Sequence, residues 1–319
     1  MQRYLLRRLA TSAGMLLALS VLMFGLLRAT PGDPIAAYIN PAVPVSEADI
    51  AALRIRFGLD RPLPVQYAAW AAAAMRGDFG YSTQPERAPV RRLLAQRALP
   101  TLLLMGSGIA LATLIGITAG VLAAARRDGP LDIALAIVGS VGISAPAFLI
   151  ALVGLFFFAV HLRWAPSGGM STPGIPRTVG DVLAHLALPA CLLAVAQATL
   201  TMRYMRAAML EVLSLDFIRT ARAKGVAEFA VITRHALRNA LLPVVTLIGA
   251  NMGAAVGGAI FIESVFNWPG MGLLLVNAAE ARDYPLMMGA AMLIGGFVLL
   301  INLGTDLLYA AIDPRIRLQ

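Results

Sequence analysis

The feature that most constrains this 319-residue sequence is the recurrence of long apolar runs without a charged side chain. These runs are about 17 to 28 residues long, and about 20 residues carry a helix across the hydrocarbon core of a bilayer. No water in that core can pair with exposed backbone groups, so each run is expected to be a helix. The sequence therefore predicts an all-α integral membrane protein with about six transmembrane helices. The expected spans are residues 9–27, 98–125, 133–160, 185–202, 240–262 and 286–305.

The composition agrees with this class. Hydrophobic residues make up 59% of the chain and charged residues 13%, whereas soluble proteins are about a quarter charged. The one cysteine, Cys191, lies inside an apolar run and is interpreted as a small buried hydrophobe.

The basic residues predict the orientation of the chain in the membrane. With the amino terminus inside, 14 of the 26 basic residues fall in cytoplasmic segments and 3 in the two short outer loops. This bias favours both termini inside and a multi-pass protein of the cell membrane. Residues 28–97 hold the other nine, in a segment long enough that the charge rule applies weakly to it. Because the net charge of +9 is spread over loops, nucleic-acid binding is not expected.

Three regions follow from this topology. Residues 1–28 are a cytoplasmic amino terminus with the first span, and residues 98–319 are a five-helix transmembrane core. Between them, residues 29–97 are expected to form a helical extracytoplasmic insertion on the membrane surface. Its Ser46-Glu47-Ala48-Asp49 has the form of a capping box, and a second short helix is expected at residues 65–75.

Several functional classes are disfavoured by what the sequence lacks. A P-loop needs a lysine followed by Ser or Thr, but the only lysine, Lys224, precedes Gly225. A transporter driven by an ion gradient would call for a carboxylate in mid-membrane, and a lipid-modifying enzyme for clustered His, Asp or Glu at one membrane face. Glu263, Asp306 and His185 lie near span ends and are interpreted as interfacial or capping groups.

The most informative segment is the long cytoplasmic loop at residues 203–239. It is expected to contain a short amphipathic helix broken by Gly225, then a helix with Phe229, Ile232, Ala236 and Leu237 along one face. Such a helix suits a groove on a partner protein. The alternative is an interfacial helix lying on anionic lipid.

The loop reads Arg219-Thr220-Ala221-Arg222-Ala223-Lys224-Gly225, then Arg234-His235-Ala236-Leu237-Arg238-Asn239-Ala240 and Leu242-Pro243. These motifs resemble the coupling-loop signature of permease subunits of ATP-binding-cassette (ABC) importers, in the dipeptide/oligopeptide and nickel branch. The general signature begins Glu-Ala-Ala, so Arg219 stands where a glutamate is usual. Further motifs of this branch occur in the same order: Pro31-Gly32-Asp33-Pro34, Gly58-Leu59-Asp60, Arg76-Gly77-Asp78-Phe79-Gly80, Glu263-Ser264-Val265-Phe266, Trp268-Pro269-Gly270-Met271-Gly272, Arg282-Asp283-Tyr284-Pro285 and Asp313-Pro314-Arg315.

The resemblance implies a type I importer-like permease fold with a cytoplasmic coupling helix around residues 220–229. It implies a permease subunit, not an enzyme, that moves di-/oligopeptides or a related small solute inward. The implied partners are a second, generally different permease, two cytoplasmic ATPase subunits that bind ATP and Mg²⁺, and an extracytoplasmic solute-binding protein. This chain is expected to hold no cofactor or metal of its own. The coupling residues that the resemblance implies are Asp216, Arg219, Thr220, Ala221, Arg222, Ala223, Lys224, Gly225, Glu228, Phe229, Arg234 and His235.

Local patterns make three further predictions. Gly249, Gly253 and Gly257, like Gly116 and Gly120, repeat at a spacing that lets helices approach closely, within one subunit or across a permease dimer. Pro146 is expected to kink the third span. Met202, Met205 and Met209 are interpreted as packing residues in preference to a metal path.

Overall fold

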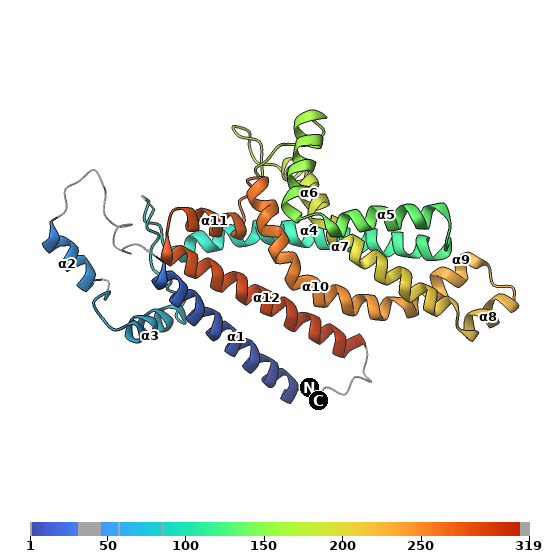
Figure 1. Ribbon diagram of the computed structural model, residues 1–319, viewed down its shortest axis with the longest axis horizontal. Coiled ribbons are helices and arrows are strands. Elements are labelled where there is room, and N and C mark those ends of the chain that lie inside the picture. Colours follow the sequence, from blue (N-terminus) through green and yellow to red (C-terminus); the bar gives the residue numbers. More distant parts are fainter. Residues whose placement is uncertain (1, 31–45, 57, 85, 313–319) are drawn as a thin grey trace. The chain divides into compact units, whose positions relative to one another are not determined.

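The computed structural model describes residues 2–30, 46–56, 58–84 and 86–312, and most of them are helical (Figure 1). The chain divides into two compact units. Unit 1 comprises Met1–Pro100 and Gly270–Phe297, and unit 2 comprises Thr101–Pro269 and Val298–Gln319. The motifs at residues 31–34 and 313–315 lie outside the described residues.

The long helices confirm an all-α membrane protein. Five described helices are long and apolar enough to cross a bilayer, and a bent helix pair makes six if it counts as one span. They extend beyond the apolar runs because the flanking polar residues are helical as well. The five are α1 (Gln2–Ala29), α4 (Val90–Ala125), α7 (Val179–Leu213), α10 (Leu237–Val265) and α12 (Tyr284–Ile312).

The third span differs from the single helix expected at residues 133–160. It consists of α5 (Pro130–Ser144) and α6 (Ala147–Gly154) with a π-helical extension, η2 (Leu155–His161), and the chain bends by 109° between the two parts. The bend lies at Ala145, whose ψ of 131° is extended. A residue before proline is pushed out of the helical region, and proline itself donates no hydrogen bond. The kink expected at Pro146 is therefore present, and it divides the span.

Helix packing in unit 2 depends on close backbone approach between α4 and α7. A Cβ on Gly120 would lie 2.7 Å from the carbonyl oxygen of Met202, a separation that only glycine tolerates. Gly249 packs as closely against Thr305 of α12. Packing within the subunit thus accounts for Gly116, Gly120 and Gly249. A Cβ on Gly253 would make an ordinary contact with Val298 (3.4 Å), and a Cβ on Gly257 would meet open space.

Unit 1 contains two short helices of the insertion at residues 29–97, α2 (Glu47–Arg56) and α3 (Leu63–Ala74). The capping box is confirmed, since the Asp49 amide donates to Ser46 Oγ (3.2 Å) and Ser46 Oγ donates to the Asp49 carboxylate (2.6 Å). A further apolar helix, α11 (Met271–Glu280), was not predicted because it is too short to read as a span. Val90 and Leu94 of α4 pack with Met271 and Leu286 in the core of this unit.

Candidate functional site

The long cytoplasmic loop is held directly by two membrane helices. In the structure α7 continues as helix to Leu213, so the first part of the loop at residues 203–239 is helical. After a turn at Ser214 and Leu215 comes α8 (Asp216–Ala223), which projects from the end of α7 (Figure 1). The chain returns through α9 (Glu228–Ala230) and the π-helical segment η3 (Val231–Ala236) directly into α10.

One face of α8 is anchored in the core of unit 2. Ile218 is fully buried and Ala221 is 9% exposed, and both pack in a cluster with Met205 and Met209 of α7. Val231 of η3 also belongs to this cluster. The methionine stripe is therefore packing, as predicted, and it lies beneath the loop. Since Ile218 and Ala221 are three residues apart on one helical face, their spacing was the signal for this anchor.

The Gly225 turn closes the loop. Gly225 has a φ of 76°, in the left-handed region that residues with a Cβ avoid. Its amide donates to the Arg222 carbonyl (3.0 Å), and the Val226 amide donates to the Ala221 carbonyl (3.2 Å). Across the turn, the Arg222 guanidinium donates two hydrogen bonds to the Glu228 carboxylate, at 2.6 Å and 3.0 Å. The pair is half-exposed and helps to hold α8 against α9.

The opposite face of α8 and the turn after it are open. Arg219 keeps 74% of its side chain exposed, and its contact with the exposed Asp216 is long, at 3.4 Å. Phe217 is 43% exposed and Phe229 is 79% exposed. Exposed aromatic residues beside cationic ones are typical of a protein-docking surface. The remaining exposed residues of this surface are Leu215, Thr220, Arg222, Ala223, Lys224 and Glu228.

The structure corrects one part of the predicted loop. Phe229 does not share a face with Ile232, Ala236 and Leu237, because Val231 occupies the packed position instead. The π-helical turn at η3 has more residues per turn than an α-helix, so the expected register shifts there. Of the other predicted residues, Ala221 faces the core, Arg234 is exposed and His235 is half-buried.

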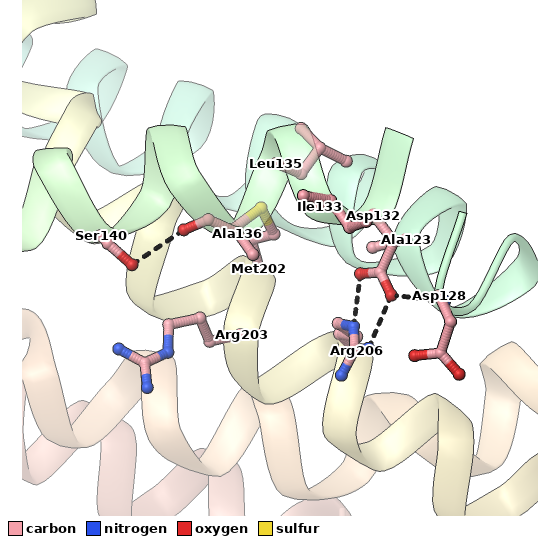
Figure 2. A pocket seen from close by; sticks show the side chains of 10 residues that line it. All are labelled: Ala123, Asp128, Asp132, Ile133, Leu135, Ala136, Ser140, Met202, Arg203 and Arg206. Atoms are coloured by element: carbon pink, nitrogen blue, oxygen red, sulfur yellow. Dashed lines mark hydrogen bonds and ion pairs between the residues drawn. The ribbon is translucent and has the colours of Figure 1, made fainter. Parts of the chain in front are cut away.

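An ion pair between α5 and α7, formed by Asp132 and Arg206, was not predicted from the sequence (Figure 2). Asp132, in the first turn of α5, is 4% exposed. Arg206 of α7 donates to it through Nε and a terminal nitrogen, each at 2.6 Å, and the Asp128 amide adds a bond of 3.0 Å. The pair borders a cavity of about 550 Å³ between α5 and α7, into which Arg203 also faces. Residues 74 positions apart carry no local spacing signal, which explains why it was missed.

Other buried ionisable groups lie at helix ends. Glu263, in the last turn of α10, is fully buried and accepts a hydrogen bond from Thr101 Oγ1 (2.6 Å). His185 is 6% exposed, and its Nδ1 lies 2.9 Å from the Asp181 carbonyl oxygen one turn earlier in α7. The described side chains contain no group of three or more His, Cys, Asp or Glu that could hold a metal ion.

The family comparison decides between the classes considered so far. Residues 116–318 match the family described as binding-protein-dependent transport system inner membrane component, and residues 1–91 match the amino-terminal part of such membrane components. The chain belongs to this permease family. It is a multi-pass protein of the cell membrane and the transmembrane permease subunit of an ABC importer. This assignment excludes a gradient-driven transporter and a lipid-modifying enzyme as the family of the chain.

Individual relatives cover essentially the whole permease. A proposed peptide permease of Brucella suis biovar 1 (strain 1330) is 58% identical over 317 residues, with 99% of each chain covered. The oligopeptide transport system permease protein AppB of Bacillus subtilis (strain 168) is 40% identical over 316 residues, again with 99% coverage. The glutathione transport system permease protein GsiC of Salmonella choleraesuis (strain SC-B67) is 40% identical over 320 residues, with 99% of each chain covered.

A solved structure supports the fold. A chain of the inward-facing MetNI methionine ABC transporter aligns with a TM-score of 0.57 at 20% sequence identity. The alignment covers 69% of this permease and 96% of that chain. The predicted type I importer-like fold is therefore confirmed. The family to which the chain belongs operates with ATPase and substrate-binding partners in general.

Proposed function

We propose that this permease carries di- or oligopeptides, or a related small peptide such as glutathione, into the cell. The proposal rests on the relatives' names, two of which specify oligopeptide and glutathione transport at 40% identity over 99% of the chain. A second, homologous permease chain would complete the pathway, and an extracytoplasmic solute-binding protein would deliver the peptide. Two cytoplasmic ATPase subunits would bind ATP and Mg²⁺, and this chain would bind neither.

The loop between α7 and α10 is proposed to transmit the ATPase movement. The observation that carries this role is the two-sided construction of α8. Ile218 and Ala221 attach one face to the core, whereas Phe217 and Phe229 stay exposed beside it. Because α8 is rigidly attached, a movement of the ATPase would be transmitted through it to α7 and α10. The exposed aromatic rings supply apolar surface that can bind in a groove of the partner.

The proposed contact residues are those of the loop that face outward. They are Asp216, Arg219, Thr220, Arg222, Ala223, Lys224, Gly225, Glu228, Phe229, Arg234 and His235, with Phe217 added from the structure. Ala221 is proposed as part of the anchor, because it packs inward. Arg219, which stands where the general signature has glutamate, is exposed enough to contact a partner directly.

The test is an affinity pull-down of the permease from detergent-solubilised membranes, with ATPase activity measured on the eluate. Deleting residues 219–228 would also remove the buried Ala221, so point variants are sharper. The double variant Phe217→Ala/Phe229→Ala is expected to lose most of the co-purified ATPase subunits and the activity. Losing two interface aromatic residues costs at least about 2 kcal/mol of binding, or about thirtyfold in affinity.

The matched control is Arg127→Ala, an exposed change in the turn between α4 and α5. It is expected to retain the ATPase subunits at the unmodified level. If the double variant retains them as well, the docking role of this surface is wrong. If the unmodified permease elutes alone under conditions that preserve other importer complexes, the proposed assembly is wrong.

A further inference from the structure

Unit 1 contains a cavity of about 830 Å³ that the proposed transport mechanism does not use. It lies among the carboxyl-terminal part of α1, helices α2 and α3, the segment 78–83 and the start of α12. Its volume is in the range of small-molecule binding sites. Most of its wall is apolar, formed among others by Phe24, Leu27, Ile55, Leu59, Trp70 and Phe79.

The walls are held in place by specific contacts. The hydroxyl groups of Tyr67 in α3 and Ser20 in α1 are hydrogen-bonded at 2.8 Å, and the Tyr67 ring meets Phe24 edge-on with centroids 5.5 Å apart. On the other side, the buried Asp283 accepts hydrogen bonds from Ser82 Oγ and from the Thr83 amide. These contacts attach α3 to α1, and Ser82 and Thr83 to the residue just before α12. The segments that line the cavity are therefore held in fixed positions by these contacts.

The charged residues of the lining are mostly basic. Arg28, Arg61 and Arg87 all contribute to the wall, against one carboxylate, Asp78, among the described lining residues. The Asp78 carboxylate accepts a hydrogen bond from the Gly80 amide (2.9 Å), and the Arg28 guanidinium lies 5.3 Å from the ring centre of Phe24. Guanidinium groups match phosphate with two parallel hydrogen bonds. The cavity thus combines an apolar wall with basic side chains that suit an anionic group.

Two lining residues of α3 carry buried polar atoms without a partner, just behind the cavity wall. Among the described residues, Trp70 Nε1 and Gln66 Oε1 are buried without a hydrogen-bond partner. They lie one helical turn apart on α3, and the Gln66 amide nitrogen is held by the carbonyls of Leu59 (3.3 Å) and Arg61 (2.7 Å). A buried indole N–H ordinarily finds an acceptor. A polar group bound in the cavity would meet this need after a small side-chain adjustment.

The surroundings of α1 indicate where such a ligand comes from. Along α1, Leu17, Leu22 and Leu26 are more than half exposed, which places this face of the helix against lipid. The arginine distribution puts the carboxyl-terminal end of α1 at the outer surface of the membrane. Basic pockets next to transmembrane helices suit anionic headgroups, and tryptophan favours the same depth. A lipid could therefore reach the cavity along α1 without leaving the bilayer.

We propose that this cavity binds an anionic phospholipid of the outer leaflet. Its phosphate lies against Arg61 and Arg87, and an acyl chain follows the apolar wall toward Phe24 and Leu27. The bound lipid fastens α3 to the membrane surface. This role is independent of which solute the importer carries.

The test measures lipid retained by the purified importer complex, using native mass spectrometry after extraction from membranes rich in phosphatidylglycerol. The unmodified complex is expected to retain phosphatidylglycerol through detergent exchange. Each arginine is expected to contribute about tenfold to the affinity for the lipid, which corresponds to about 1.4 kcal/mol. Arg61→Ala/Arg87→Ala is therefore expected to retain much less phosphatidylglycerol. Arg76→Ala, an exposed arginine of the same unit outside the cavity lining, is the control and is expected to retain the unmodified amount.

Equal retention by the double variant and the unmodified complex would overturn the proposal, as would an equal loss in Arg76→Ala. A second measurement covers the case in which the double variant does not assemble. Brominated phosphatidylglycerol is expected to quench tryptophan fluorescence in a Trp164→Phe background, which removes the 74% exposed Trp164 and keeps Trp70 and the fully buried Trp268. Adding Trp70→Phe should remove that quenching. If it does not, or if brominated phosphatidylcholine quenches equally, the anionic lipid site is wrong.

Discussion

At the scale of the residue, Gly225 shows how one backbone angle shapes the coupling loop. Its φ of 76° turns the chain between α8 and α9, and this turn brings Arg222 within hydrogen-bonding distance of Glu228. A Cβ at Gly225 would meet open space, so backbone conformation, not crowding within the chain, selects glycine. The turn lies beside the proposed ATPase-docking surface, where its geometry decides how Phe229 is presented relative to Phe217.

Substitutions at Gly225 should therefore follow their tolerance of the left-handed region. Gly225→Asn should keep most of the uptake in a purified complex, because asparagine adopts this conformation readily. Gly225→Trp adds strain of about 1 to 2 kcal/mol and bulk at the docking surface, so uptake should fall about tenfold or more. The protein should still reach the membrane in normal amounts. Unchanged uptake with Gly225→Trp would contradict the role assigned to this turn.

At the scale of the element, the Asp132–Arg206 pair ties α5 to α7. The carboxylate is 4% exposed and accepts three hydrogen bonds, two from Arg206 and one from the Asp128 amide. Because α7 leads directly into α8, the same helix carries the coupling loop at its end and the divided third span at its side. The pair gives α5 a fixed attachment at its cytoplasmic end.

Removing one partner of the Asp132–Arg206 pair should lower the stability of the complex more than removing both. Arg206→Met leaves the buried Asp132 carboxylate without its arginine and should destabilise the purified complex by about 3 kcal/mol. This loss is at the lower end of the range for broken buried ion pairs, because about a third of the Arg206 side chain is exposed. Arg206→Met/Asp132→Asn should recover part of that loss. Arg203→Met, on the same helix and the same cavity, is the control and should change the melting temperature little. Additive effects in the double variant would show that the pair does not couple α5 to α7.

At the scale of the whole molecule, the basic residues and the apolar helices assign an inside and an outside. The α4–α5 turn is expected in the cytoplasm with the coupling loop, and helices α2 and α3 are expected outside. The family and fold comparisons support a type I importer permease. The proposed lipid cavity and the proposed coupling loop are then expected to face opposite sides of the membrane.

This topology can be tested with single cysteines in a Cys191→Ala background. The interpretation of Cys191 as buried is wrong, because its side chain is exposed on α7, so it must be removed first. Arg76→Cys should react with a membrane-impermeant maleimide added to intact cells or spheroplasts. Arg127→Cys should react only after the membrane is opened. Both positions are exposed, so accessibility within the protein does not limit the reaction. Labelling of Arg127→Cys from outside would show that the assigned orientation is wrong, and with it the two functional assignments that depend on it.

The sequence by itself determined the class, the number of spans and the permease family. Apolar runs long enough to cross a bilayer have few alternatives to helix, and the loop motif with Gly225 is local in the chain. The capping box at Ser46 and the kink at Pro146 were predictable for the same reason. Each depends on residues within about one helical turn.

Only the tertiary structure decided how these elements are joined. The anchor of Ile218 on Met205, the Asp132–Arg206 pair and the cavity beside Trp70 all combine residues from different helices. The exposure of Phe229 followed from a π-helical turn that shifts the helical register, which no apolar periodicity shows. Local patterns specify helices because backbone hydrogen bonds close within a turn. Contacts between helices depend on three-dimensional packing, and a single sequence does not display it.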